Sequence, residues 1–147
     1  KLNDGLYDAI ILSYAGIKSL RIENKITEVF STQEIIPSAG QGIIALQCRN
    51  NDDKIIPVLD KINDNKTFHR ANAERNVLKI LEGDCETAVG VFADIDKDMI
   101  NLEAELFSLD GRERFYLKSS KEISKAKELG TEVGNKLKRD SNNCYKK

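Results

Sequence analysis

The chain has 147 residues, of which 40% are hydrophobic and 32% are charged, a balance typical of a soluble globular protein. Its 23 Lys and Arg residues and 24 Asp and Glu residues give a net charge of -1, so no nucleic acid and no anionic membrane is expected as a main partner. The longest apolar runs are far shorter than the roughly 18 residues that a membrane span requires. Three scattered cysteines and the lack of a signal peptide predict free thiols and a cytoplasmic location.

Apolar runs near the start of the chain predict short strands of the kind that parallel sheets bury. These runs lie at 7–12, 26–30 and 43–49. The first run begins close to the start of the chain and has no visible partner upstream. This part is therefore expected to be the end of an α/β domain that belongs to a larger protein, and a small domain that starts with a strand is the alternative.

Two short helices and a loop are expected between and after these strands. Residues 13–20 predict a helix with Ser13 as its N-cap. Proline and glycine punctuate residues 31–42, which predict a loop. Residues 52–62 have the apolar spacing of a helix, with Pro57 in its first turns.

The second half of the chain predicts a complete two-layer α+β unit. Asp64 is expected to cap its first helix and Gly83 to end that helix. The elements expected, in chain order, are a helix over 65–82, strands over 88–95, 99–106 and 114–119, and an amphipathic helix over 123–137. The fold class is thus the end of an α/β domain followed by a domain of helix, three antiparallel strands and helix.

Arg75 interrupts the apolar stripe that is expected on the helix over 65–82. Helical spacing places Phe68, Ala71 and Leu78 on the same face. Because an isolated buried charge is costly, Arg75 is expected either to pair with Glu82 or to bind an anion at a domain boundary. The residue pattern leaves both interpretations open.

Cys85 follows the same helix and has acidic neighbours at Glu82, Asp84 and Glu86. These carboxylates and the negative end of the helix dipole both disfavour a thiolate. Such a cysteine is poorly suited to nucleophilic attack in every turnover. It is either an inert thiol or a residue that an electrophile alkylates once.

Other reactive residues assemble no recognisable active site. His69, the only histidine, is expected on a helix surface, and Cys48 is expected in the core. The 38–42 segment lacks the Lys-Ser/Thr pair of a phosphate-binding loop and is interpreted as a hinge. No cluster of Cys, His and carboxylates has metal-ligand spacing, and no Ser-His-Asp set can be assembled.

Short stretches along the chain resemble one family, hydroxymethylbilane synthase, which is also called porphobilinogen deaminase. Their order and spacing agree with the family from the first predicted strand to the turn at 109–111. The matching stretches are Tyr7-Asp8-Ala9-Ile10-Ile11-Leu12, Ala15-Gly16-Ile17-Lys18, Ala39-Gly40-Gln41-Gly42, Gln47-Cys48-Arg49, Ala73-Glu74-Arg75 and Leu81-Glu82-Gly83-Asp84-Cys85.

The resemblance implies an enzyme of tetrapyrrole and haem biosynthesis, a deaminating transferase. The family condenses four porphobilinogen units head to tail to hydroxymethylbilane and releases ammonia. It uses a dipyrromethane cofactor held by a thioether, and Cys85 stands at the position of the attached cysteine. Arg75 matches a family arginine, and Gln41 with Gly42 matches a segment beside the carboxylates of substrate and cofactor.

Three residues near the first helix are expected to bind substrate by the same resemblance. Ser13 falls where the main chain of the family approaches the pyrroles. Ser19 replaces a substrate-binding arginine of the family, and Lys18 and Arg21 are the cations that could compensate. A lysine does not reproduce the bidentate clamp of an arginine, so substrate handling is expected to differ here.

The resemblance also implies a division of the chain into three parts. Residues 1–42 would complete a middle α/β domain and a hinge, and residues 43–64 would return a strand and a helix to the first domain. Residues 65–147 would form the carboxyl-terminal domain with the cofactor cysteine. Since the catalytic aspartate belongs to the missing amino-terminal half, no catalytic residue is expected in this chain, which alone should be inactive.

A second class of function shares the order helix, three strands, helix. A double-stranded RNA-binding domain has this order and uses lysines near its last helix, where this chain has four, at Lys118, Lys121, Lys125 and Lys127. Residues 88–147 nevertheless hold 12 Lys and Arg against 11 Asp and Glu, a weak balance for RNA binding. A small-ligand sensor without catalysis is a further alternative.

Overall fold

The computed structural model describes residues 1–83 and 86–146, which divide into two compact units. Unit one comprises Lys1–Ser31 and unit two comprises Thr32–Lys147. Asp84 and Cys85 lie outside the described residues. Each unit is described by itself below.

Unit one contains little regular structure. It has the short helix α1, Tyr14–Ser19, and a 3₁₀ turn, Glu23–Lys25. The strands expected at 7–12 and 26–30 are not formed, and no residue of unit one is buried. An apolar strand is stable only when neighbouring strands take up its backbone hydrogen bonds and a core covers its side chains. Neither is provided within residues 1–31.

The segment that leads to the second half of the chain is also mostly extended. The strand expected at 43–49 is not formed, and Ile44 is 89% exposed. Helix α2, Ile56–Ile62, begins four residues later than expected, with Pro57 in its first turn, where a missing N–H costs nothing. Asp52 accepts a hydrogen bond from the Ile55 amide at 3.1 Å and so precedes the helix instead of starting it.

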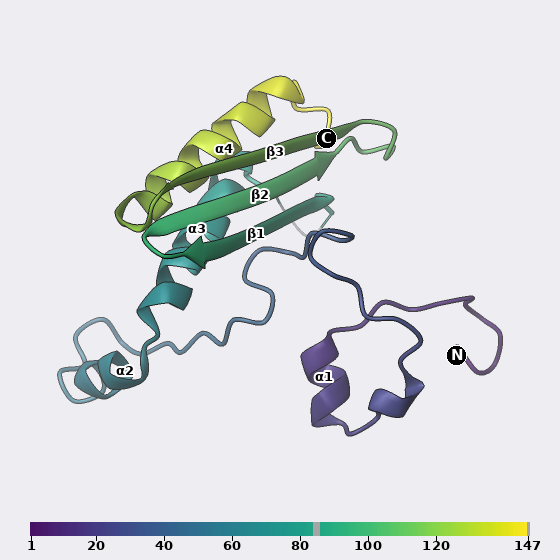
Figure 1. Cartoon of the computed structure of the whole chain (residues 1–147), viewed down its shortest axis with the longest axis horizontal. Helices are drawn as coiled ribbons and strands as arrows, with labels where there is room; N and C mark the ends of the chain where they lie inside the picture. The colour runs from purple at the N-terminus through teal and green to yellow at the C-terminus, as the bar shows by residue number, and fades with distance from the viewer. Residues whose placement is uncertain (84–85, 147) are drawn as a thin grey trace. The chain divides into compact units, whose positions relative to one another are not determined.

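Three antiparallel strands form the sheet of unit two, in the order β1-β2-β3 (Figure 1). Their bounds are Val89–Asp96 for β1, Met99–Phe107 for β2 and Arg114–Glu122 for β3. Each strand lies where the sequence predicts one, because short turns at 97–98 and 108–113 join neighbours along the chain. The expected order of helix, three strands and helix is confirmed.

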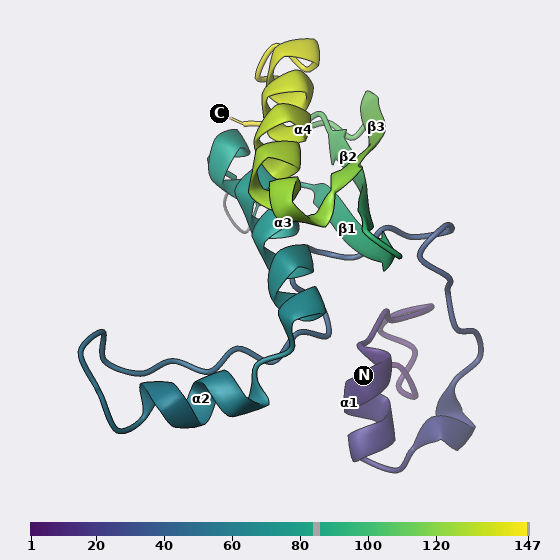
Figure 2. The same ribbon diagram turned by 60° about the vertical axis from the view of Figure 1, so that its left-hand side comes forward.

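Helices α3, Asn65–Leu81, and α4, Ala126–Asp140, both cover one face of this sheet (Figure 2). The 3₁₀ turn Ile123–Lys125 leads into α4. Alternate strand residues turn inward, as the period of two requires. The core comprises Ala73, Val77, Leu81, Val91, Ala93, Ile100, Leu102, Ala104, Leu106, Ala126, Leu129, Val133, Leu137 and Tyr145.

The ends of α3 are set by polar groups. Asp64 caps the helix as expected, because its carboxylate accepts a hydrogen bond from the Thr67 amide at 2.7 Å, which lowers the pKa of Asp64. At the other end Glu82, and not Gly83, takes the left-handed conformation, with φ at 54°. The left-handed residue that ends α3 is therefore Glu82, one residue before the expected Gly83.

Candidate functional site

The residues directly before the predicted hinge, 36 and 37, lie along the free edge of the sheet. Ile36 is buried and contacts Gly90, where an added Cβ would come within 2.6 Å of the Ile36 carbonyl oxygen. The carbonyl of Pro37 accepts a hydrogen bond from the Val91 amide at 2.8 Å. Residues 36–37 therefore pair with β1 at the edge that β2 does not cover.

Glu74 of α3 connects this segment to the sheet. Its Oε2 accepts a hydrogen bond from the Gly40 amide at 2.7 Å, and its Oε1 accepts one from the Ala93 amide at 2.8 Å. Glu74 is only 3% exposed, and its bond to the Ala93 amide is buried while its bond to the Gly40 amide is part-buried. A buried carboxylate of this kind is stabilised by charge-assisted hydrogen bonds from main-chain amides.

Gln41 and Gly42 follow directly and are exposed. Two consecutive turns present them, closed by hydrogen bonds from the Gln41 amide to Ser38 and from the Ile43 amide to Gly40, each at 3.0 Å. Gly40 and Gly42 have φ near 77° and 78°, the left-handed region that glycine occupies without strain. The Gln41 side chain and the Gly42 amide have no partner among the described residues, so both can donate to a ligand.

Arg75 is exposed, which contradicts the expectation that it interrupts a buried stripe. The buried face of α3 carries Ala73, Val77 and Leu81, whereas Phe68 is 54% exposed. Apolar residues lie on more than one face of this helix, so the apolar spacing alone predicts the wrong face as the buried one. The choice of face depends on where the sheet lies.

The proposed pairing of Arg75 with Glu82 is also wrong. Glu82 instead binds Lys138 and Lys146, each with a 3.0 Å contact between Nζ and Oε2. These two ammonium groups, Lys138 foremost, lower the pKa of Glu82. Arg75 has no ion pair with any residue that the structure describes.

Arg75 borders a hollow of about 330 Å³ between α3 and α4. Lys79 and Lys127 line the same hollow, and neither forms an ion pair within the described part of the chain. Asn72 and Asn76 complete the lining. Cations gathered around a hollow without acidic partners favour an anion there, so the chemistry of this face fits carboxylate groups.

Cys85 falls outside the described residues, and the structure provides no test of its role. The end of α3 that precedes it is well held. The hydroxyl of Tyr145, a side chain only 1% exposed, donates to the Leu81 carbonyl at 2.9 Å, and Lys138 Nζ donates to the Ile80 carbonyl at 3.3 Å. The carboxyl-terminal residues of the described chain thus hold the last turn of α3 in place.

The three expected substrate-binding residues lie around α1 in unit one. Ser13 is the N-cap residue, but its hydroxyl makes no capping bond and is exposed. Lys18 lies with Nζ 5.8 Å from the centre of the Tyr14 ring, and Arg21 adopts a left-handed φ of 55° just after the helix. Ser19 bonds back to the Ala15 carbonyl at 3.0 Å.

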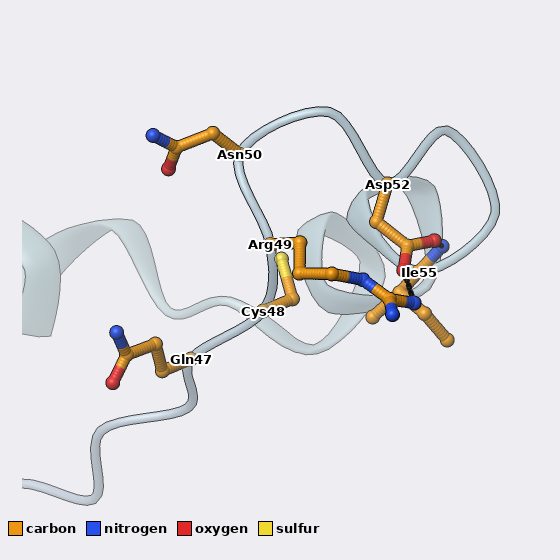
Figure 3. A pocket seen from close by; sticks show the side chains of 6 residues that line it. All are labelled: Gln47, Cys48, Arg49, Asn50, Asp52 and Ile55. Atoms are coloured by element: carbon orange, nitrogen blue, oxygen red, sulfur yellow. Dashed lines mark hydrogen bonds and ion pairs between the residues drawn. The ribbon is translucent and has the colours of Figure 1, made fainter.

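A larger hollow of about 770 Å³ lies where the extended segment turns toward α2 (Figure 3). Arg49 and Asp52 form an ion pair of 2.7 Å there, which holds the pKa of Asp52 below its ordinary value. Figure 3 shows Gln47 and Asn50 pointing away from this pair. Cys48, expected in the core, is only half-buried. The hollow lies at a bend of the chain, and Gln47, Asn50 and Ile55 complete its lining.

Two kinds of site find no support in the described residues. No group of His, Cys, Asp and Glu among residues 1–83 and 86–146 is arranged to hold a metal ion. Within the same residues no helix combines the length and the apolar character that crossing a membrane requires. His69 lies on α3, and its ring makes a T-shaped contact with the Phe68 ring, with 6.2 Å between ring centres.

Sequence reasoning overlooked Glu74. It treated this residue only as part of a matching stretch, although a glutamate next to Ala73 and three residues before Val77 borders the buried face of α3. The signal that could have revealed it is a carboxylate at the margin of an apolar stripe, where a buried partner must be found.

Two models of one protein family match the chain. The model of the porphobilinogen deaminase C-terminal domain matches residues 68–139. The model of the porphobilinogen deaminase dipyromethane cofactor binding domain matches residues 1–57. Arg75 and Cys85 fall in the first matched range, and the expected residues of unit one and the hinge fall in the second.

Curated relatives agree with the family models. A porphobilinogen deaminase of Desulforamulus reducens is 36% identical over 137 residues, which cover 93% of this chain and 44% of the relative. One of Prochlorococcus marinus is 31% identical over 138 residues, 94% of this chain and 44% of the relative. The chain therefore spans less than half the length of the curated relatives that it matches.

Proposed function

The chain belongs to the porphobilinogen deaminase family, and from this membership we propose that it serves in tetrapyrrole biosynthesis. The reaction is the head-to-tail condensation of four porphobilinogen units to hydroxymethylbilane, with release of ammonia. The observation that carries the proposal is that two models of one family match successive parts of the chain, residues 1–57 and 68–139.

The proposed cofactor is dipyrromethane, joined to Cys85 by a thioether. When bound, this group supplies the primer from which the pyrrole chain is extended. The acidic surroundings of Cys85 suit a thiol that reacts once and then serves as an anchor. Arg75, Gln41 and Gly42 are proposed to bind its carboxylates, and the absence of any ion pair at Arg75 among the described residues supports that role.

Ser13, Lys18 and Arg21 are proposed to bind porphobilinogen. All three are exposed around α1, and two are cations suited to the carboxylates of the substrate. Lys18 is held beside Tyr14, so its ammonium group has a defined position from which to donate. With Ser19 in place of an arginine, the binding is expected to rest on single ammonium contacts, which are less directional than a guanidinium fork.

The amino-terminal half of the same protein is the proposed partner and the source of the catalytic aspartate. Exposed apolar side chains support this, since Ile11 is 74% exposed and Ile44 is 89% exposed. In this proposal residues 1–42 complete a middle domain and hinge, residues 43–64 return to the first domain, and residues 65–147 form the third. The chain alone is inactive, and the cytoplasm is its proposed location.

RNA binding, the alternative suggested by the order of elements, is not supported by the comparisons. Two of the lysines that it would require are already engaged. Lys118 binds Glu103, and Lys121 binds both Glu128 and Glu132. These carboxylates compete with a phosphate backbone for both ammonium groups.

The decisive experiment is an intact mass of the chain, followed by a peptide map around Cys85. The chain is purified alone and after co-production with the amino-terminal half, which is expected to complete the cofactor site. An added mass of two linked pyrrole units on the Cys85 peptide, present after co-production and absent from a Cys85→Ser variant, is the expected result. Porphobilinogen consumption by the reconstituted protein is then measured.

Two outcomes would contradict the proposal. One is an unmodified Cys85 in a reconstituted protein that also fails to consume porphobilinogen. The other is an adduct that maps to Cys48 or Cys144, the free thiols of the described chain, instead of Cys85.

A further inference from the structure

The outer edge of β1 is covered by groups that are far apart in the sequence. β2 pairs with one side of β1 and leaves the other without a strand. On that side Pro37 accepts from the Val91 amide, and Glu74 accepts from the Ala93 amide. Arg70 of α3 donates through Nε to the Ala93 carbonyl at 2.6 Å. Unpaired edge groups are thereby satisfied.

Glu74 differs from the other groups on this edge because it accepts hydrogen bonds from two separate segments. One oxygen holds β1 at Ala93, and the other holds the hinge at Gly40. Arg70, one turn earlier on α3, contacts β1 at the Ala93 carbonyl and the Phe92 ring and makes no contact with the hinge among the interactions of the described residues. The two residues therefore make a comparable contact with the strand, and only Glu74 adds a contact with the hinge.

We infer that Glu74 is a positioning residue that fixes the hinge to the carboxyl-terminal domain and so sets where Gln41 and Gly42 present their donors. This inference rests on the proposed function, in which those donors bind carboxylates of substrate and cofactor. Gly40 is the residue directly before Gln41, so the bond to Glu74 acts one peptide away from the donors. Arg75 is the next residue on α3, so one short stretch of helix carries both the hinge contact and an anion-binding side chain.

The two oxygens of the Glu74 side chain serve both amides. Each Glu74 oxygen accepts from a different N–H group, at 2.7 Å and 2.8 Å. A glutamine has the same shape, but its NH2 group would face one N–H donor with another donor. The Gly40 amide is the one expected to detach, because Ala93 is also held by Arg70 and by the sheet.

The first test needs no variant and no substrate. Amide hydrogen exchange of the 147-residue chain is followed by NMR, with Gly40 compared with Gly42. Both glycines lie in the same turn, but only the Gly40 amide donates to a buried carboxylate. We expect Gly40 to exchange at least about tenfold more slowly than Gly42, since a hydrogen bond to a charged group is worth about 1.5 kcal/mol or more and about 1.4 kcal/mol is tenfold. Equal exchange at the two amides would overturn the inference.

The second test compares Glu74→Gln with Arg70→Met. Glu74→Gln is expected to speed exchange over 38–42 by about tenfold while residues 99–107 of β2 keep their protection. Arg70→Met weakens the same strand contact and leaves Gly40 bound, so it should leave exchange over 38–42 unchanged. An equal effect of both variants would mean that Glu74 acts only on the strand, and the inference would fail.

The third test uses the full-length protein with its amino-terminal half. Glu74→Gln is expected to raise KM for porphobilinogen severalfold with a smaller change in kcat, because it displaces binding donors and no reacting group. Arg70→Met should leave KM unchanged. If the unsubstituted protein does not turn over porphobilinogen, the proposed function fails while the exchange tests still decide whether Glu74 holds the hinge. Unchanged KM in an active Glu74→Gln enzyme with a released hinge would overturn the positioning role.

Discussion

Two glycines of α4 determine how closely the two helices approach. A Cβ added at Gly130 would lie 2.2 Å from the Ala73 carbonyl oxygen, and one added at Gly134 would lie 2.8 Å from Ile80 Cβ. Asn76 reinforces the contact, because its amide donates to the Lys127 carbonyl at 2.8 Å. The helices therefore meet backbone to backbone at Gly130, where no other side chain fits.

Gly130→Ala is expected to destabilise the chain by about 1–3 kcal/mol, since the added methyl group meets a main-chain oxygen that cannot move aside alone. The gain in helix propensity, about 1 kcal/mol, is too small to offset this. Gly134→Ala should cost less, because its nearest neighbour is a side chain. Guanidinium unfolding measures both, with the exposed Asn135→Ala of the same helix as control. A Gly130→Ala chain as stable as Asn135→Ala would contradict the expected close contact.

The elements that the sequence predicts well are those whose partners lie nearby in the chain. β1, β2 and β3 follow one another through short turns, so each apolar pattern has its pairing strand within reach. The runs at 7–12 and 43–49 have the same composition but no pairing strand in the described residues, and they stay extended. A local pattern records the tendency to form a strand, whereas pairing decides whether the strand forms.

For single residues, sequence-based prediction is limited by the unknown orientation of each helix. The sequence does not determine which face of α3 packs against the sheet. The apolar spacing therefore places Arg75 in the buried stripe and misses the burial of Glu74. Both errors follow from one rotation of the helix, about 100° per residue. Motif spacing, by contrast, needs no knowledge of the packing, and the family that it indicates is confirmed.

The carboxyl-terminal segment stabilises the end of α3. Tyr145 is buried, and its hydroxyl donates to the Leu81 carbonyl, one of the last carbonyl groups of the helix without a helical partner. Tyr145→Phe removes only this bond and should cost about 1 kcal/mol, because the Leu81 oxygen is left buried and unsatisfied. Thermal unfolding measures the change, and Tyr116→Phe, whose hydroxyl donates to Glu103 on the exposed sheet face, is the control. Equal effects of the two variants would argue against a special role for the buried bond.

Glu82 makes the same helix end sensitive to acid. Lys138 and, next, Lys146 lower its pKa from the ordinary value of 4.5, so the folded chain binds the proton less readily than the unfolded chain. The resulting stability is fully present above about pH 4.5 and is lost as the pH falls through the lowered pKa. Glu82→Gln is expected to be less stable than the parent chain at neutral pH and to approach it in acid. Urea unfolding over a pH series measures this, with the exposed Glu122→Gln as control, and a difference that persists in acid would contradict the pairing.

At the scale of the whole chain, the buried core belongs to unit two. No residue in 1–31 is buried, and the buried apolar side chains begin at Ile36. Hydrophobic stabilisation follows the apolar area removed from water, at about 25 cal/mol per Å². Unit one therefore contributes little to the core, and its apolar side chains remain available for the proposed amino-terminal half.

A chain that begins at residue 32 is accordingly expected to match the full chain in stability within about 0.5 kcal/mol. A chain that begins at residue 44 is the matched comparison, because it also loses the hinge. It loses the buried Ile36 and leaves Glu74 without the Gly40 amide, so it should be weaker by about 2 kcal/mol or more. Guanidinium unfolding followed by circular dichroism measures all three chains, with the midpoint reporting stability and the slope reporting the surface exposed. If the chain that begins at residue 32 were already much less stable than the full chain, unit one would pack against the core. If all three chains were equally stable, the hinge would not contribute to the stability of the core. The expected order, with the loss falling between residues 32 and 44, would locate the boundary of the independently stable domain at the hinge itself.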